Sequence, residues 1–209
     1  MEIRRTANAG VLLTMDDVQI LLDGVCREVK PYLATPTAEW ELLTSRWPDA
    51  VCFTHTHEDH FHPDYAATYK AATGREILMP GGDGEWETGN VRITRVPTRH
   101  LGKAGAAAEH CSFVVQGGKS LWMMGDAAPI QLKKMEHLPK PDVLVVPFAF
   151  FTTQSAVEML KPYLPCTIVL VHMPSADNDP DGLWNAVAPG MAQLKEFIYA
   201  PNLGETITL

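Results

Sequence analysis

Thr54-His55-Thr56-His57-Glu58-Asp59-His60-Phe61-His62-Pro63 follows directly on the apolar run Ala50-Val51-Cys52-Phe53. Three histidines and an aspartate fall within residues 55–60, and neutral imidazole nitrogen and carboxylate oxygen are ligands of divalent metals such as zinc. Isolated histidines are common, but this density directly after a buried strand is not. The stretch therefore predicts a metal site, and the alternative is a surface loop that happens to be rich in histidine.

The spacing of the ligands indicates more than one ion. In an extended segment His55 and His57 point to the same side, because side chains alternate with a period of two. Asp59 and His60 follow where the chain turns towards a helix that begins with Pro63, so they point elsewhere. One segment can thus supply ligands to two neighbouring ions.

His-x-His-x-Asp-His after a hydrophobic strand resembles the signature of the metallo-β-lactamase superfamily, and the resemblance covers the whole chain. It implies an α/β fold, the four-layer αβ/βα metallo-β-lactamase-type sandwich. The family pattern continues with a strand-end histidine, a Gly-Asp aspartate and a last strand-end histidine, which His100, Asp126 and His172 match in order. The ligand set that the resemblance implies is His55, His57 and His100 for one ion, Asp59, His60 and His172 for the other, and Asp126 as the bridge.

His110 competes with His100 for a place among the ligands. A strand that begins at Cys111 and pairs antiparallel with one that ends at Met124 also starts near the predicted rim. We favour His100 because it closely follows a strand, and we assign His110 to a supporting or substrate-facing position, with proton donation to the leaving group as one role. His62 is expected at a helix start and His137 in solvent.

Strand and helix signals alternate along the chain. Strands are expected at 11–15, 18–22, 50–54, 76–79, 91–96, 111–116, 119–124, 143–146, 167–171 and 205–209. Helices are expected at 37–47, 63–72, 130–136, 155–160 and from Asp181, with an interruption at Pro189-Gly190, and loops at 80–90 and 101–109. Hairpins mixed with strand and helix alternation favour two sheets covered by helices.

Length and composition predict one domain over residues 1–209. With 209 residues and 46% hydrophobic content, the chain can bury a sizeable core. The four cysteines, which form no Cys-x-x-Cys pair, are expected to be buried free thiols, as in a reducing compartment. A formal charge of −8 disfavours a nucleic-acid surface. Because there is no signal-peptide pattern and no apolar run of about 20 residues, we expect a cytoplasmic protein without a membrane partner.

The expected function is metal-dependent hydrolysis of a small-molecule substrate. Two zinc ions about 3.5 to 4 Å apart would hold a bridging water, lower its pKa to around 7 and polarise the oxygen of the bond that it attacks. Asp59 would also accept the proton of that water. Zinc is favoured, with Mn²⁺ or Fe²⁺ as alternatives, and the sequence does not define an oligomeric state.

The resemblance also narrows the reaction. Diiron oxygen-reducing members typically carry glutamate at the position of His57, true β-lactamases usually carry cysteine at that of Asp126, and tRNA-processing members carry an extra RNA-binding arm. A lactone or sugar-phosphate lactone is the preferred substrate class, followed by a phosphodiester. A diiron redox protein and a non-catalytic metal-binding relative are the remaining alternatives.

Overall fold

The computed structural model describes residues 1–102 and 108–209, so the middle of the predicted loop 101–109 lies outside the described residues. Two sheets form the centre of the molecule. The first consists, in spatial order, of β13 (Thr206–Thr208), β1 (Glu2–Arg5), β2 (Val11–Met15), β3 (Val18–Leu22), β4 (Ala50–Cys52) and β5 (Ile77–Leu78). The second consists of β12 (Ile198–Tyr199), β11 (Thr167–Val171), β10 (Val143–Pro147), β9 (Ser120–Met123), β8 (Glu109–Gln116), β7 (Val91–Arg99) and β6 (Gly84–Thr88).

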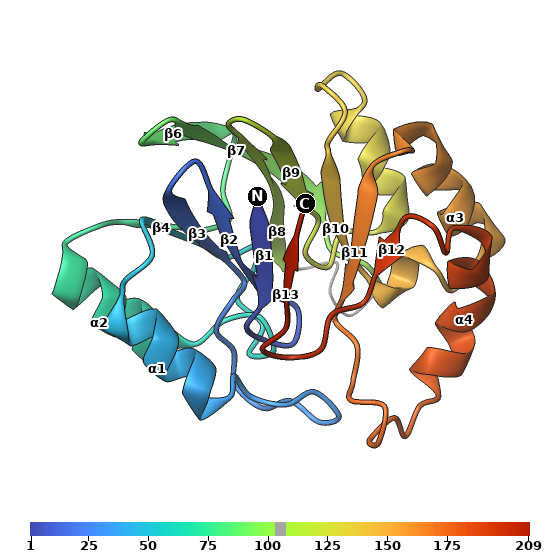
Figure 1. The fold of residues 1–209 in the computed structure, drawn as a ribbon, viewed down its shortest axis with the longest axis horizontal. Helices are drawn as coiled ribbons and strands as arrows, with labels where there is room; N and C mark the ends of the chain where they lie inside the picture. The colour runs from blue at the N-terminus through green and yellow to red at the C-terminus, as the bar shows by residue number, and fades with distance from the viewer. Residues whose placement is uncertain (103–107) are drawn as a thin grey trace.

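Helices cover the outer face of each sheet, which gives four layers (Figure 1). The first sheet carries α1 (Thr37–Ser45) and α2 (Pro63–Thr73). The second carries α3 (Gln154–Leu160), α4 (Leu183–Gln193) and the 3₁₀ helices η2 (Pro129–Met135), η3 (Phe148–Phe150) and η4 (Lys161–Tyr163). This arrangement is the predicted αβ/βα sandwich.

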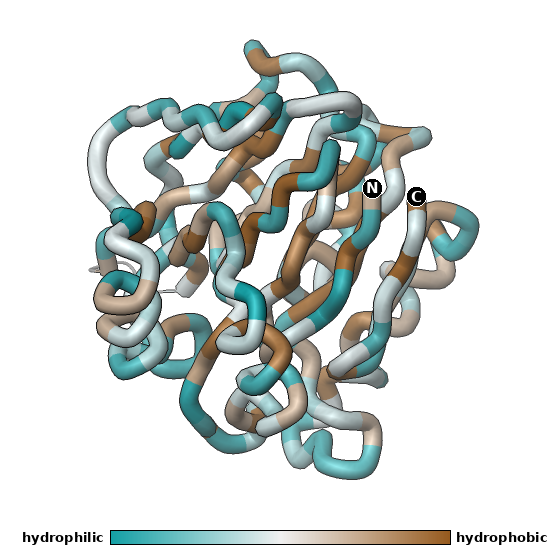
Figure 2. The backbone as a smooth tube through the Cα atoms, turned by 60° about the vertical axis from the view of Figure 1, so that its left-hand side comes forward, coloured by the Kyte–Doolittle hydropathy of each residue, from teal (hydrophilic) through white to brown (hydrophobic). Residues whose placement is uncertain are grey.

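Three buried clusters hold the layers together. The largest lies between the sheets and joins side chains such as Leu13 and Ile20 to Phe113 and Val145. A second packs Trp122 and its neighbours under α3 and α4, and a third lies under α1 and α2. The hydropathy colouring follows this division, with brown segments along the central strands and teal at the outer turns (Figure 2).

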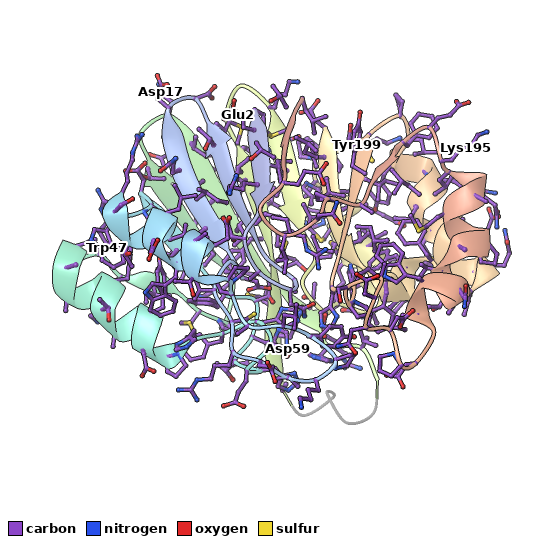
Figure 3. The ribbon with its side chains drawn as sticks, turned by 60° about the horizontal axis from the view of Figure 1, so that its bottom comes forward. Glu2, Asp17, Trp47, Asp59, Lys195 and Tyr199 are labelled. Atoms are coloured by element: carbon purple, nitrogen blue, oxygen red, sulfur yellow. The ribbon has the colours of Figure 1, made fainter. Side chains whose placement is uncertain are left out.

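The strand directions determine where the site lies. β3 and β4 run parallel, as do β9, β10 and β11, and β7 points the same way as β9 because each pairs antiparallel with β8. Their carboxyl ends therefore meet at one rim of the sandwich. Figure 3 shows Asp59 at this rim and Glu2 and Asp17 at the opposite end.

Several elements differ from the prediction. β1 was not predicted, because its sequence Glu-Ile-Arg-Arg is mostly charged although Ile3 and Arg5 are buried. β6 lies within the predicted loop 80–90, because an edge strand that alternates between partly buried and exposed residues shows no apolar pattern. The segment 130–136 is 3₁₀ rather than α-helical. The predicted interruption at Pro189-Gly190 is wrong, since α4 continues through both residues. Gly190 allows this helix to pack against the Phe151 carbonyl, with which any Cβ would clash.

The four cysteines are buried and unpaired, as predicted. Within the two described ranges, no helix combines the length and the apolar character needed to cross a membrane.

Candidate metal centre

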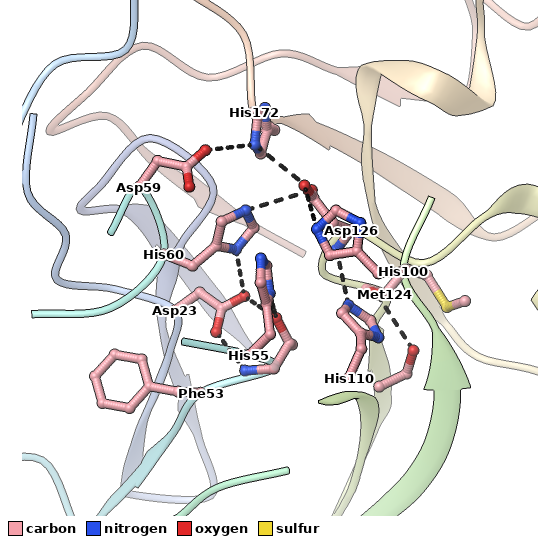
Figure 4. A network of polar contacts seen from close by, with 12 residues as sticks. Asp23, Phe53, His55, Asp59, His60, His100, His110, Met124, Asp126 and His172 are labelled. Carbon is pink, nitrogen blue, oxygen red and sulfur yellow. Dashed lines mark hydrogen bonds and ion pairs between the residues drawn. The ribbon is translucent and has the colours of Figure 1, made fainter. Parts of the chain in front are cut away.

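All seven predicted ligands lie together at the rim, and all but His57 are labelled in Figure 4. Three of them come from loops directly after strands: His100 after β7, Asp126 after β9 and His172 after β11. The remaining four lie in the loop between β4 and α2. Figure 4 labels His55, His60 and Asp59 from this loop, and His57 packs against His55 with a ring-centroid distance of 4.6 Å.

Asp126 lies at the centre of the cluster. Its Oδ1 is 3.3 Å from His60 Nε2 and 3.5 Å from His172 Nε2. Its Oδ2 is 3.4 Å from His100 Nε2. The two carboxylate oxygens therefore face different histidines, as expected of a carboxylate that can bridge two cations.

The other donor atoms form a first group, His55, His57 and His100, and a second group, Asp59, His60 and His172. A third group, Asp23, His55 and His60, shares one histidine with each of them. Within each group the ligand atoms lie within 4.8 Å of one another. In the second group His172 Nε2 is 3.1 Å from Asp59 Oδ2. The first and second groups are the two sets that the sequence resemblance implies.

Hydrogen bonds fix the tautomers of three histidines. Thr54 Oγ1 donates to Asp23 and therefore accepts from His55 Nδ1 at 3.0 Å. His60 Nδ1 donates to Asp23 Oδ2 at 2.9 Å, and His100 Nδ1 donates to the Leu101 carbonyl at 2.6 Å. Because each Nδ1 carries a proton, Nε2 is the nitrogen that faces the rim, and it presents a lone pair whenever the imidazole is neutral.

Asp23, which directly follows β3, is a residue of the site that was not predicted from the sequence. It is fully buried and accepts hydrogen bonds from the Thr54 backbone N–H at 2.7 Å, the Thr54 hydroxyl at 2.6 Å and His60 Nδ1. A carboxylate behind a metal-binding histidine fixes the ring and increases its basicity. Its position after β3, parallel to the metal-motif strand, was the signal that could have identified it.

His110 supports Asp126 from behind. Its Nε2 accepts the Asp126 backbone N–H at 3.1 Å, so its proton lies on Nδ1, 2.8 Å from Thr98 Oγ1. Burial lowers the pKa of His110 to about 3. Of the roles considered for His110, these contacts fit the supporting one, because no proton on this ring faces the rim. His62 lies at the N-cap of α2, and His137 is exposed, as expected.

The pKa shifts in the cluster show that its buried carboxylates favour positive charge on the histidines beside them. Burial lowers the pKa of His60, but Asp126 and Asp23 outweigh this effect and hold it well above the ordinary value. Burial raises the pKa of Asp126, but His172 and His60 outweigh it, and the pKa lies well below its usual range. Burial, together with the nearby His60, lowers the pKa of His55. A positive charge on His60 therefore stabilises the buried carboxylates of Asp23 and Asp126 that face its two ring nitrogens.

Unsatisfied buried atoms test whether a metal fits. His55 Nε2, His60 Nε2, His100 Nε2 and Asp126 Oδ1 are buried and make no hydrogen bond to the described residues. Such atoms carry a free-energy penalty unless a partner satisfies them. Since all four are metal-ligand atom types aimed at one rim, the His/Asp cluster can bind metal ions.

Aromatic side chains and loops flank the second ligand group. The Tyr32 ring packs edge-on against His172 at 4.5 Å, and the Phe148 ring lies 5.5 Å from the same imidazole. His172 has a left-handed backbone conformation, with φ of 58°. The Asn8 carbonyl accepts its N–H at 3.0 Å.

Comparison with known proteins agrees with this geometry. Residues 2–163 match the family model described as the β-lactamase superfamily domain. The chain belongs to this superfamily. Its four-layer sandwich is the metallo-β-lactamase fold, as the resemblance of its histidine motif implied.

Solved structures with this fold include several metal-dependent enzymes. A possible metal-dependent hydrolase from Veillonella parvula has a TM-score of 0.75 and 16% identity, covering 100% of this chain and 99% of that one. An isothiocyanate hydrolase from Delia radicum gut bacteria has a TM-score of 0.68 and 18% identity over 100% and 99%. A diiron β-hydroxylase from Streptomyces venezuelae has a TM-score of 0.68 and 13% identity, and the match covers 100% of this chain and 54% of the hydroxylase. No curated protein matches the sequence.

Proposed function

We propose that this protein is a hydrolase that uses two divalent metal ions, zinc in preference to manganese or iron, to cleave a lactone or a related ester. One ion would be held by His55, His57 and His100 and the other by Asp59, His60 and His172, with Asp126 between them. When bound, the ions supply a water of lowered pKa and polarise the carbonyl that it attacks.

The proposal rests on one observation: the two oxygens of the Asp126 carboxylate face histidines of different ligand groups. Oδ2 faces His100 of the first group, whereas Oδ1 faces His60 and His172 of the second. A structural ion pair would need only one histidine. Two histidine groups on the two oxygens of one carboxylate support a dinuclear centre.

The protein's own residues would contribute orientation and proton transfer. Asp59 approaches His172 through Oδ2, which leaves Oδ1 free to accept the proton of the attacking water. Asp23 orients His60, and His110 fixes the backbone of Asp126. Tyr32 and Phe148 shield His172 and restrict access of bulk water to this side.

We infer the identity of the metal from the types of its ligands. Zinc takes imidazole and carboxylate ligands, and His57 stands where the diiron members of the family typically carry glutamate. The diiron β-hydroxylase shares the fold, so the fold alone does not separate the two metals. Elemental analysis of purified protein, together with the absorbance of an iron centre, distinguishes zinc from iron directly.

A substrate panel with added Zn²⁺ or Mn²⁺ tests the reaction. It contains lactones, a phosphodiester, a thioester and an aryl isothiocyanate, the last because an isothiocyanate hydrolase shares the fold over its full length. We expect metal-dependent lactone or ester hydrolysis that Asp59→Asn abolishes. Selective turnover of the phosphodiester would support the second candidate instead. Stoichiometric zinc without any turnover would favour a non-catalytic relative.

A further inference from the structure

A cavity of about 510 Å³ lies between the segment after His100 and the start of α3. We call it the apolar subsite and define it by Leu101, Ala128, Ile130, Ala149 and Met159. The other described residues that line it are glycine, proline, alanine, serine and threonine. None of the described lining residues carries a charge, in a chain whose formal charge is −8.

Backbone contacts connect this cavity to the metal centre. Leu101 donates its N–H to the Asp126 carbonyl at 2.7 Å, and its own carbonyl accepts from His100 Nδ1. Ala128 donates to the Arg99 carbonyl at 3.1 Å and follows the bridge between His100 and Ala127. One wall of the subsite is therefore the same pair of segments that presents two ligands.

The opposite wall also begins at the metal centre. Ala149 directly follows Phe148, whose ring lies 5.5 Å from that of His172. Met159 and the first residues of α3 continue this wall away from the rim. A substrate whose reacting carbonyl lies at Asp126 thus has an uncharged cavity beside it.

A second cavity, of about 400 Å³, has a different chemistry. Its lining includes Tyr32, which packs against His172, and the charged residues Glu28, Lys30 and Asp181. Two carboxylates outnumber one ammonium group there. A phosphate is usually held by clustered cations or backbone N–H groups. The described lining of the apolar subsite contains no cation, and that of the second cavity contains only Lys30.

We propose that the apolar subsite binds an uncharged alkyl or aryl portion of the substrate. The preferred substrate is then an apolar lactone or ester rather than a sugar-phosphate lactone. This inference rests on the proposed hydrolytic function for its kinetic test, while its binding test is independent of turnover.

The kinetic test uses γ-butyrolactone, γ-hexalactone and γ-nonalactone, with a phosphorylated sugar lactone as the charged comparison, on zinc-loaded protein. We expect kcat/KM to rise about fourfold for each methylene that becomes buried. The phosphorylated lactone should be the poorest substrate. Ile130→Asp should flatten the rise, because it places a carboxylate in the subsite. Leu42→Asp, at a similarly exposed apolar residue on α1, should leave the rise unchanged.

The binding test uses a thiol as the probe. Since the four native cysteines are buried, Ile130→Cys introduces an accessible thiol at the subsite and Leu42→Cys introduces one elsewhere. We expect hexan-1-ol to slow labelling of Ile130→Cys at least threefold and to leave labelling of Leu42→Cys unchanged. Glycerol 3-phosphate should protect neither.

The outcomes separate the two proposals. Lactone turnover without any dependence on chain length, or best turnover of the phosphorylated lactone, would overturn the subsite and leave the hydrolase standing. Absence of turnover on every lactone and ester would overturn the proposed function, and the labelling experiment would still decide whether the cavity binds apolar ligands. Equal labelling of Ile130→Cys with and without hexan-1-ol would overturn the subsite.

Discussion

At the scale of single residues, the candidate metal centre depends on side chains that do not face the rim. His55, His60 and His100 present Nε2 because a neighbouring oxygen accepts the proton of Nδ1. Asp23 fixes two of these partnerships, since it accepts from His60 and from the Thr54 hydroxyl that orients His55. The orientation of these imidazole rings is thus determined by the residues that accept hydrogen bonds from their Nδ1 atoms.

Asp23→Asn should weaken zinc binding by roughly 10- to 100-fold, the usual effect of removing a partner of a metal-binding histidine. The amide would place a donor against either Thr54 or His60, both of which already donate to this carboxylate. Competition with a chromophoric chelator measures the affinity. Asp142→Asn is the control, since Asp142 also accepts a backbone N–H, from Ser120, but precedes β10 at the far end of the sheet. Equal losses in both variants would refute the role of Asp23.

The sequence predicted which side chains gather at the rim where a strand end coincided with a metal-ligating residue type. His100, Asp126 and His172 each follow a strand, and parallel strands of one sheet end at the same rim. Asp23 also directly follows a strand. Because an Asp-Gly pair is equally typical of a turn, its place in the site was not predicted. The place of His100 after a strand favoured it over His110 already in the sequence, whereas the supporting role of His110 follows only from its hydrogen bonds.

At the scale of elements, two loops hold the last ligand in place. Arg5, at the end of β1, is 6% exposed and donates to the backbone carbonyls of Asn8 and Met173 at 2.9 and 3.0 Å, as well as to Pro201. The Asn8 carbonyl also accepts the His172 N–H. Arg5 therefore connects the segments on both sides of the left-handed His172 backbone.

Arg5→Lys should lower the free energy of unfolding by about 2 kcal/mol, because several buried carbonyls lose their donors. It should also weaken binding of the ion that His172 holds. Urea denaturation and zinc titration measure the two effects. Arg4→Lys is the matched control, since Arg4 lies on the same strand but pairs with Glu39 at 2.6 Å, away from the rim. A variant Arg5→Lys with unchanged zinc affinity would contradict the positioning of His172.

Gly125 joins the two sheets at the rim. Its φ is 54°, and a Cβ there would overlap Thr54 Oγ1. Gly125→Ala should destabilise the fold by about 2–3 kcal/mol through strain and overlap. Gly74→Ala, with φ of 68° and open space around the Cβ position, should cost only about 1 kcal/mol. Thermal unfolding compares the two, and equal costs would show that the Thr54 contact does not constrain the rim.

Elements were predicted well where burial imposes a pattern and poorly where it does not. β10 and β11 are buried along their length and were identified, whereas β6 is an edge strand defined by its pairing with β7. The Pro189-Gly190 pair has the composition of a helix end, yet α4 continues because Gly190 packs on Phe151. In β6 and in α4, tertiary contacts therefore outweigh the loop-like preference of the local sequence.

At the scale of the whole molecule, the sandwich brings a buried, proton-dependent charge cluster to one rim. Without metal, the ion pair of His60 and Asp126 stabilises the fold at pH values between the lowered pKa of Asp126 and the raised pKa of His60. The His60 contribution is complete below the ordinary histidine pKa and is lost as the pH rises through its raised value. A metal ion requires neutral His60 and therefore displaces this proton.

Zinc binding at pH 7 should accordingly release about one proton per chain from His60. The stabilisation by zinc should grow as the pH rises from 5.5 to 8, because fewer protons then compete for the histidine ligands. Calorimetry in two buffers with different ionisation enthalpies counts the protons. A binding enthalpy independent of the buffer would mean that His60 is already neutral without metal.

The metal content of the purified protein tests the central claim, a pair of ions bridged by Asp126, most directly. After zinc loading and removal of excess metal, elemental analysis should give about two ions per chain for the wild type and for His137→Ala, whose imidazole is exposed. Asp126→Ala should retain less than one, because both ligand groups lose their shared oxygen donors. Wild-type zinc content in Asp126→Ala would contradict the account.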